Sequence, residues 1–281
     1  MAPFESSPPK DLLRSTFDHD FIRGHITPGT AERAYLGLPG ERMLDVLEWQ
    51  DCLDKAVCIH RDIEGIDAMK DVATDAGITP RCEFHRGDID QILEDETDAD
   101  GQLLVDRPYH VVNLDYESGL IQAESARRLE AIRSLFELQA EHRVDFVLLL
   151  SLGPRGRPGN FVGRTLSQIG RILDGYRIDA SGNILWYKAQ PDNKHLWKVF
   201  VPYAIESRAR AFRYELAAWQ SFFYQGTGDT PMMHFVMFFH YAVGDLVPES
   251  INLAQLLTSR LNRVTDRIQP DPLRPPPLTY R

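Results

Sequence analysis

The sequence predicts an α/β protein with a mostly parallel sheet that carries helices on both faces. Short apolar runs alternate with helical segments, polar residues follow the predicted strands, and two aromatic β-rich segments stand near the end. With 281 residues, 43% hydrophobic and 26% charged, the chain can form one large domain or two small ones. We predict an N-terminal arm at 1–25, an α/β domain at 26–250 with a helical insertion around 178–218, and a C-terminal helix with a proline-rich tail at 251–281.

The composition argues against several classes of protein. No apolar run approaches the roughly 20 residues of a membrane span, and no signal core is present, so we expect a cytoplasmic protein without a membrane segment. Cys52, Cys58 and Cys82 are odd in number and lack CxxC spacing, and the nine histidines lack ligand spacing, so we expect no metal site. The formal net charge of −10 argues against broad electrostatic binding of nucleic acid but leaves room for a local basic patch.

The first two predicted strands each lead into a site-like feature. Residues 34–36 enter the turn Gly37-Leu38-Pro39-Gly40, where glycines let the backbone approach a ligand and a helix start offers N–H groups. The second strand, Lys55–His60, ends just before Asp62. Asp62 follows the turn by about 20 residues, the separation at which nucleotide sites place a carboxylate for the ribose hydroxyls. The alternative is that Asp62 caps the next helix.

A third strand at 81–85 leads to Asp88 and Ile89, so an acid again follows a strand. Residues 90–100 are acidic, and we interpret them as a linker. Ligands bind at the carboxyl ends of the strands in open α/β sheets. Acids after successive strands therefore favour a ligand site over helix capping alone.

The fourth strand ends in the polar and aromatic residues Asn113, Asp115 and Tyr116. Val111 and Leu114 are typical of a buried parallel strand, so polar groups at its end predict a site. The alternative is that Asp115 only caps the following helix.

The rest of the chain supplies a crossover helix, a fifth strand and a hairpin. Residues 124–143 have the apolar period of a helix, and residues 144–150 are typical of a strand. The arginine-bearing loop at 153–159 is either a phosphate contact or a solvated surface loop. Trp219–Gly226 and Met232–Val243 predict an antiparallel hairpin that closes the sheet.

This order of elements resembles the class I S-adenosylmethionine-dependent methyltransferase superfamily, as a divergent member. In that Rossmann-like fold a glycine loop follows the first strand, acids follow the second and third, and a polar-aromatic motif ends the fourth. The hairpin is the most specific part, because nicotinamide-binding Rossmann domains end in parallel strands. A nicotinamide oxidoreductase is accordingly the weaker alternative. The resemblance covers about residues 31–243.

The resemblance implies S-adenosylmethionine as the cofactor and assigns six residues to it. The methionine and ribose part would lie against the first loop, the ribose hydroxyls would bind one acid, and the adenine would contact the residues after the third strand. In that order, these residues are Gly37, Leu38 and Gly40, then Asp62, then Asp88 and Ile89.

The resemblance also implies the active-site residues. Asn113-Leu-Asp-Tyr116 is similar to the Asn-Pro-Pro-Tyr motif of enzymes that methylate exocyclic amines. Asn113 and Asp115 would accept hydrogen bonds from the target amine, and Tyr116 would stack on a flipped-out base.

The first loop departs from the family pattern. Gly37-Leu-Pro-Gly40 is not Gly-x-Gly-x-Gly, and Pro39 removes one backbone donor. Two functions remain open at this point: a methyltransferase acting on a nitrogen of a nucleic acid or nucleotide-like substrate, or a non-catalytic methyltransferase-like subunit that binds a protein partner.

Overall fold

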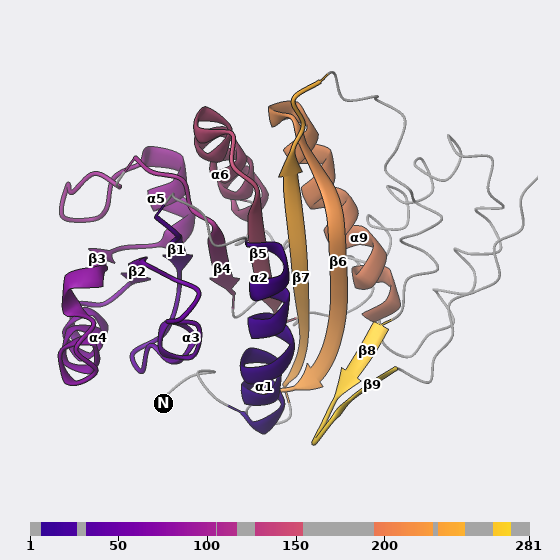
Figure 1. The fold of residues 1–281 in the computed structure, drawn as a ribbon, viewed down its shortest axis with the longest axis horizontal. Coiled ribbons are helices and arrows are strands. Elements are labelled where there is room, and N and C mark those ends of the chain that lie inside the picture. Colours follow the sequence, from indigo (N-terminus) through magenta and orange to yellow (C-terminus); the bar gives the residue numbers. More distant parts are fainter. Residues whose placement is uncertain are drawn as a thin grey trace, which may run out of the picture.

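Nine strands form a single mixed sheet in the described part of the chain (Figure 1), which is seen in a computed structural model. The structure describes residues 7–26, 32–104, 106–116, 127–153, 194–226, 230–244 and 261–270. The strand order is β3-β2-β1-β4-β5-β7-β6-β8-β9. Among the described helices, none has the length and apolar character needed to cross a membrane.

The first five strands are parallel, as the sequence predicts. They are β1 (Ala34–Gly37), β2 (Lys55–His60), β3 (Cys82–Arg86), β4 (Val111–Asp115) and β5 (Phe146–Leu152). All of β5 is buried, as expected for a strand covered on both faces. The carboxyl ends of these strands share one edge, at the bottom of Figure 1, so the side chains that follow them can meet.

The predicted hairpin is confirmed. β6 (Tyr214–Gln225) and β7 (Pro231–Tyr241) are antiparallel, and β7 lies between β6 and β5. β6 begins five residues before the predicted start, because a register shift between Leu216 and Ala218 lets pairing continue past the irregular burial pattern there.

Two core clusters lie on the two faces of the sheet, so the predicted helices on both faces are confirmed. On one face lie α5 (Ile89–Asp95), α6 (Arg128–His142) and α9 (Lys194–Ala209), with the short η4 (Arg210–Phe212). On the other lie the N-terminal helices, α3 (Leu44–Glu48), α4 (Ile63–Asp75) and the short η2 (Thr79–Arg81).

The acidic linker predicted at 90–100 is wrong, because its first half is the helix α5. Ile89, Ile92 and Leu93 form a buried stripe at helical spacing. The acids occupy the rest of the helix and hide this period in the sequence.

Within the predicted N-terminal arm, the described residues form helices that pack against the sheet. They are α1 (Pro8–Leu12), the π-helical η1 (Leu13–Asp18) and α2 (His19–His25). Leu13 and Ile22 are buried, and Phe17 packs edge-on against Phe222 of β6. Proline does not prevent this helix, because Pro8 stands in its first turn, where proline is tolerated.

The helical insertion predicted around 178–218 is only partly described. α9 is helical, but 214–218 belongs to β6, and 178–193 lies outside the described residues. The arginine-bearing loop lies outside them as well, apart from Gly153.

In the C-terminal segment, the described residues form two strands where the sequence predicts a helix and a tail. β8 (Leu261–Val264) pairs in parallel with β6, and β9 (Ile268–Pro270) pairs with β8. Leu261 and Val264 are buried by this pairing. Residues 251–260 and 271–281 are not among the described ones.

Candidate active site

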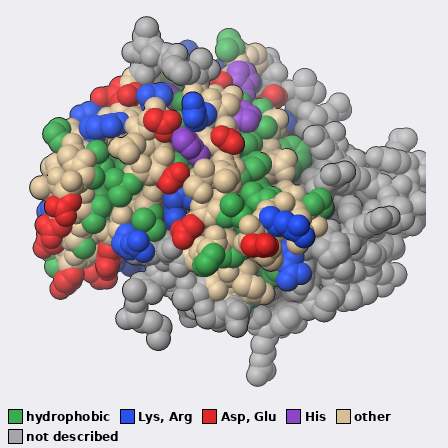
Figure 2. Space-filling model, turned by 60° about the horizontal axis from the view of Figure 1, so that its bottom comes forward, with side chains coloured by type: hydrophobic (Ala, Val, Ile, Leu, Met, Phe, Trp, Pro, Cys, Tyr) green, Lys and Arg blue, Asp and Glu red, His purple; other side chains and the backbone are tan. Residues whose placement is uncertain are grey.

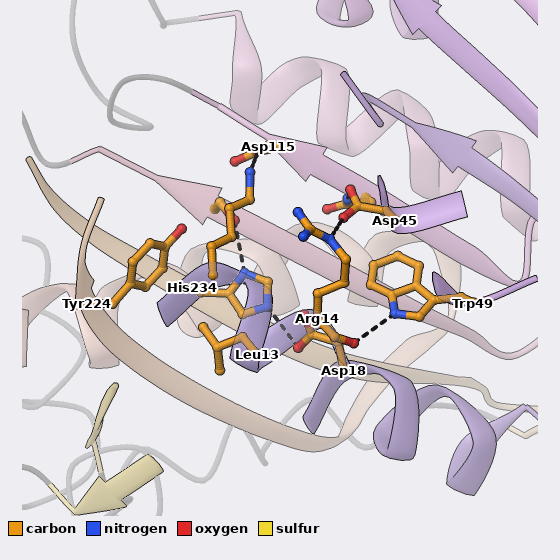
Figure 3. Close-up of a pocket in the computed structure, with 11 residues that line it drawn as sticks. Leu13, Arg14, Asp18, Asp45, Trp49, Asp115, Tyr224 and His234 are labelled. Carbon is orange, nitrogen blue, oxygen red and sulfur yellow. Dashed lines mark hydrogen bonds and ion pairs between the residues drawn. The ribbon is translucent and has the colours of Figure 1, made fainter. Parts of the chain in front are cut away.

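A cavity of about 10 Å³, with room for no more than about one water molecule, lies at the carboxyl ends of β4 and β5 (Figure 3). Side chains from α1, η1, α3, β6 and β7 complete its walls. The N-terminal helices therefore cover the edge where the sequence predicts chemistry. This volume is far below the roughly 300–1,000 Å³ typical of ligand pockets, because side chains of the N-terminal helices fill the space at this edge.

Two ion pairs attach the N-terminal helices to this edge. Lys10 pairs with Asp115, and Arg14 pairs with Asp45 of α3. Asn113 donates from Nδ2 to Oδ2 of Asp45 at 2.6 Å. Burial is the largest effect on the pKa of Lys10 and would lower it, but the charges of Asp115, Tyr224 and Asp45, with the hydrogen bond to Asp115, together raise the pKa above its usual range. The structure thus brings Asn113 and Asp115 into one cavity, each with a charged or polar partner.

A buried chain of hydrogen bonds lines the other side of the cavity. Ser151 Oγ lies 2.9 Å from His234 Nδ1, and His234 Nε2 lies 3.1 Å from Asp18 Oδ1. Tyr224 adjoins Ser151, and burial raises its pKa well above the usual range. The sequence indicates only that His234 shares one strand face with His240, because Ser151 and Asp18 are 83 and 216 residues away from it.

Tyr116 lies apart from Asn113 and Asp115, on the face of the sheet that α5 and α6 cover. It is 4% exposed, and its hydroxyl donates to Asp90. The guanidinium of Arg128 stands over its ring, 4.2 Å from the centroid. Burial raises the pKa of Asp90, and the hydrogen bond from Tyr116 opposes that rise.

The loop after β1 is packed against β4. A Cβ on Gly37 would stand 2.4 Å from the backbone oxygen of Asn113, so only glycine fits. The N–H of Leu38 donates to that same oxygen at 3.1 Å, and the buried Pro39 has no N–H. Gly40 has a φ of 69° and begins the next turn. Gly37 is therefore required by the packing of β1 against β4, and the first half of the loop has few backbone donors for a cofactor.

Asp62 stands exposed at the end of β2, at the N-cap position of α4, yet its carboxylate makes no capping bond. His60 lies beside this helix start, where its Nδ1 accepts from the backbone N–H of Asp62 at 3.1 Å. The His60 ring lies where a Cβ on Gly65 would come within 2.1 Å, so the glycine makes room for it. The carboxylate of Asp62 is left facing solvent, which fits a ligand for ribose hydroxyls.

Asp88 holds two groups of the protein. Its Oδ1 accepts from the N–H of Asp90 at 2.9 Å, which caps α5, and its Oδ2 accepts from Arg61 at 2.7 Å. Ile89 beside it is buried. An adenine amino group would have to share Asp88 with the exposed Arg61 side chain.

Figure 2 brings the bottom of Figure 1 forward, so that it looks toward the carboxyl edge. On the described part of this face, acidic and basic side chains are mixed over most of the surface, and acidic side chains gather along the lower left edge. A substrate at this edge would be held by the cavity's own side chains rather than by a broad positive surface.

Comparison with protein-family models gives no match, and neither does comparison with curated protein sequences. Among solved structures, the chain is similar to PH1948 from Pyrococcus horikoshii, a candidate RNA methyltransferase. That similarity has 9% identity and a TM-score of 0.44, over 83% of this chain and 84% of that one.

Two further solved structures have similar values. An O-methyltransferase from Bacillus cereus in complex with SAH has 10% identity and a TM-score of 0.41, over 84% of this chain and 83% of that one. Spermidine synthase from Thermotoga maritima has 11% identity and a TM-score of 0.42, over 86% of this chain and 64% of that one.

The fold is assigned from the sheet itself. Five parallel strands in the order β3-β2-β1-β4-β5 are followed by β7, which is antiparallel and lies between β5 and β6. This arrangement, with helices on both faces, is the one that the resemblance implies. The chain has the Rossmann-like fold of class I methyltransferases.

Proposed function

We propose that the chain is an S-adenosylmethionine-dependent methyltransferase whose site is the carboxyl edge of β1, β2 and β4. One observation carries the proposal. The exposed carboxylate of Asp62 at the end of β2 makes no capping bond to α4, and Asp115 lines a cavity at the end of β4. β1 lies between these two strands. In this fold, that edge is where the cofactor and the substrate meet.

The cofactor supplies an electrophilic methyl group on a sulfonium. In the proposal, Asp62 accepts hydrogen bonds from the ribose hydroxyls, and the loop from Gly37 through Leu38 to Gly40 lies against the methionine and ribose part. Asp88 and Ile89 contact the adenine. The exposed side chain of Arg61 moves aside or shares Asp88, which surface exposure permits.

In the proposal, the target nitrogen enters the cavity beside Asn113 and Asp115. The carboxylate of Asp115 accepts a hydrogen bond from the amine and stabilises the positive charge that develops there. In the structure Lys10 is paired with this carboxylate and α1 closes the cavity, so the amine replaces Lys10 after α1 moves away. His234, oriented by Asp18, receives through Ser151 the proton that the methylated nitrogen loses.

We further propose that the substrate is a nitrogen of a nucleic acid or a nucleotide-like molecule. The support is chemical, because Asn113 and Asp115 stand together at the strand end and both carry acceptor oxygens. The ring of Tyr116 has one face under Arg128, so any stacking on a base uses its other face or follows a shift of Arg128.

Transfer of a tritiated methyl group to total RNA, denatured DNA and a nucleoside mixture tests this function. We expect label in at least one substrate, and a fall of about 100-fold or more in Asp115→Asn. Asp106→Asn is the matched control. Asp106 is exposed and precedes the start of β4, at the opposite end of the strand from Asp115. Absence of label from all three substrates, or equal transfer by Asp115→Asn, would contradict the proposal.

A second candidate function is a non-catalytic methyltransferase-like subunit that binds a protein partner. The ion pair of Lys10 with Asp115 and the missing donor at Pro39 favour it. Under this function, the chain co-purifies with a partner whose activity survives Asp115→Asn. Methyl transfer by the isolated chain would rule it out.

A further inference from the structure

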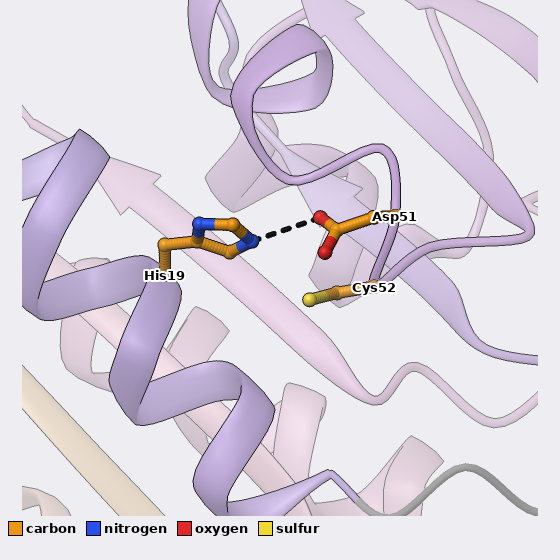
Figure 4. Close-up of side chains that lie close together, drawn as sticks. All are labelled: His19, Asp51 and Cys52. Carbon is orange, nitrogen blue, oxygen red and sulfur yellow. Dashed lines mark hydrogen bonds and ion pairs between the residues drawn. The ribbon is translucent and has the colours of Figure 1, made fainter.

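A histidine, a carboxylate and a thiol converge where the N-terminal helices meet the turn after α3 (Figure 4). His19 begins α2, while Asp51 and Cys52 follow α3. One ligand atom from each residue lies within 4.8 Å of the other two. His19 Nε2 is 2.8 Å from Asp51 Oδ1, and in Figure 4 the Cys52 side chain points into the space between them.

We propose that these three side chains bind one Zn²⁺ ion or a similar borderline transition metal. Imidazole nitrogen, thiolate sulfur and carboxylate oxygen are the donors that Zn²⁺ takes in proteins, and three of them with a water complete a tetrahedral site. Bonds of about 2.0–2.3 Å place tetrahedral ligands roughly 3.3–3.8 Å apart, which small side-chain shifts reach here. A thiolate and a carboxylate together balance the charge of the ion.

The surroundings let an ion enter. The side chain of Asp51 is 51% exposed and that of His19 is 19% exposed, so solvent reaches the open side of the cluster. Arg23 is the competing cation, with Nη1 3.9 Å from Asp51 Oδ2, but its side chain is 61% exposed and can turn outward. Arg33 contacts the backbone oxygen of Asp51, which leaves the carboxylate accessible.

The other two cysteines are separate from this cluster. Cys58 and Cys82 lie on the neighbouring strands β2 and β3. Cys82 therefore offers a matched control, a thiol in the same chain that is held away from His19.

Such a metal would join the N-terminal helices to the body of the fold. α2 continues directly from the helices that carry Lys10, Arg14 and Asp18 over the cavity. Bound metal would therefore hold these helices in place. The sequence predicts no metal site because His19 and Asp51 are 32 residues apart, outside any local ligand spacing.

Titration of the metal-free full chain with Co²⁺ tests the site, since thiolate-bound Co²⁺ shows a charge-transfer absorption in the near ultraviolet. We expect that band to saturate at one Co²⁺ per chain and to disappear when Zn²⁺ is added. His19→Ala and Cys52→Ser should weaken binding at least about 100-fold, beyond the effect of losing an outer-shell contact. Cys82→Ser should bind like the wild type.

Thermal unfolding gives a second readout. Zn²⁺ should raise the melting temperature of the wild type and of Cys82→Ser, because a ligand of the folded state stabilises it, and leave His19→Ala unchanged. His19 is partly exposed, so its replacement keeps the fold, and circular dichroism checks this. A missing thiolate band, or equal binding by His19→Ala and the wild type, would overturn the site whatever the outcome for methyl transfer.

Discussion

The ammonium of Lys10 on α1 forms a mostly buried ion pair with Asp115 at the end of β4, 105 residues along the chain. The N-terminal segment therefore takes part in the candidate site instead of preceding it. The residue with the strongest claim to chemistry is held, in this conformation, by a helix outside the parallel sheet.

Replacing Lys10 by methionine should destabilise the protein by about 2–3 kcal/mol. The substitution keeps the apolar stem but leaves Asp115 without its cation in a mostly buried place. The raised pKa of Lys10 also means that its charged form stabilises the folded protein. This stabilisation is complete below the ordinary lysine pKa of about 10.4 and is lost as pH rises through the higher folded pKa. Urea unfolding at neutral pH measures the effect.

The matched control for that change is Lys70→Met. Lys70 is half exposed on α4 and pairs with Asp67 at 3.6 Å, so its loss should cost less than about 0.5 kcal/mol. Equal losses of unfolding free energy in Lys10→Met and Lys70→Met would mean that the ion pair of Lys10 with Asp115 contributes nothing to stability.

Gly37→Ala should cost about 3 kcal/mol, because the new Cβ would push against the backbone oxygen of Asn113 and separate β1 from β4. Gly24→Ala is its control, since a Cβ there meets nothing within 4 Å and alanine favours the helix. The denaturant midpoint should fall for Gly37→Ala and should rise or stay unchanged for Gly24→Ala. A tolerated Gly37→Ala would show that the two strands are not so close.

His234→Ala should cost about 2–4 kcal/mol, since it opens a cavity and leaves the buried Asp18 without its partner. His240→Ala tests the same strand face at an exposed position, where the pair with Asp145 is worth less than about 1 kcal/mol. Unfolding of the two variants side by side measures the difference. Similar costs would refute the buried hydrogen-bond chain.

The pH dependence of stability should carry a signature of Asp90. Because the pKa of Asp90 is raised in the folded protein, its protonated form contributes to stability. This contribution is complete below the unfolded pKa of about 3.9 and is lost as pH rises through the higher folded pKa. Stability of the wild type minus that of Asp90→Asn should therefore fall with rising pH above about 4, by at most about 1.4 kcal/mol per unit.

Tyr116→Phe sharpens that test. It removes the hydrogen bond that lowers the pKa of Asp90 and keeps the ring beneath Arg128. The fall should still begin near pH 4, where the unfolded carboxyl ionises, but it should continue to higher pH because the folded pKa is raised further. Urea midpoints between pH 3 and 7 report both variants, and a flat difference across this range would contradict the burial of Asp90.

The parallel strands could be predicted from the sequence because each is an apolar run with polar residues at its end. β2 lies where it was predicted, and the antiparallel β7 confirms the hairpin. α5 could not be recognised, because its acids mask the three buried apolar residues. The N-terminal helices could not be recognised because prolines usually indicate a non-helical segment, whereas here they occupy the first turn of α1.

The candidate site was predictable only in part. Local sequence patterns place Asp62 and Asp115 at the carboxyl ends of two predicted strands. Because these strands are parallel in the sheet, both residues lie at the same edge. Asp18, Ser151 and His234 meet only after distant segments pack, and no spacing in the sequence encodes their contact. The same holds for Lys10, whose partner is set by where α1 docks.

Calorimetric binding of S-adenosylhomocysteine, the demethylated product of the cofactor, tests the central claim most directly. The wild type should bind one molecule, and Asp62→Ala should weaken binding about 10- to 100-fold, the value of a hydrogen bond to a charged group. Asp71→Ala, an exposed acid further along the same helix, should bind like the wild type. Absence of binding by the wild type, or equal binding by Asp62→Ala, would contradict a cofactor site at this edge.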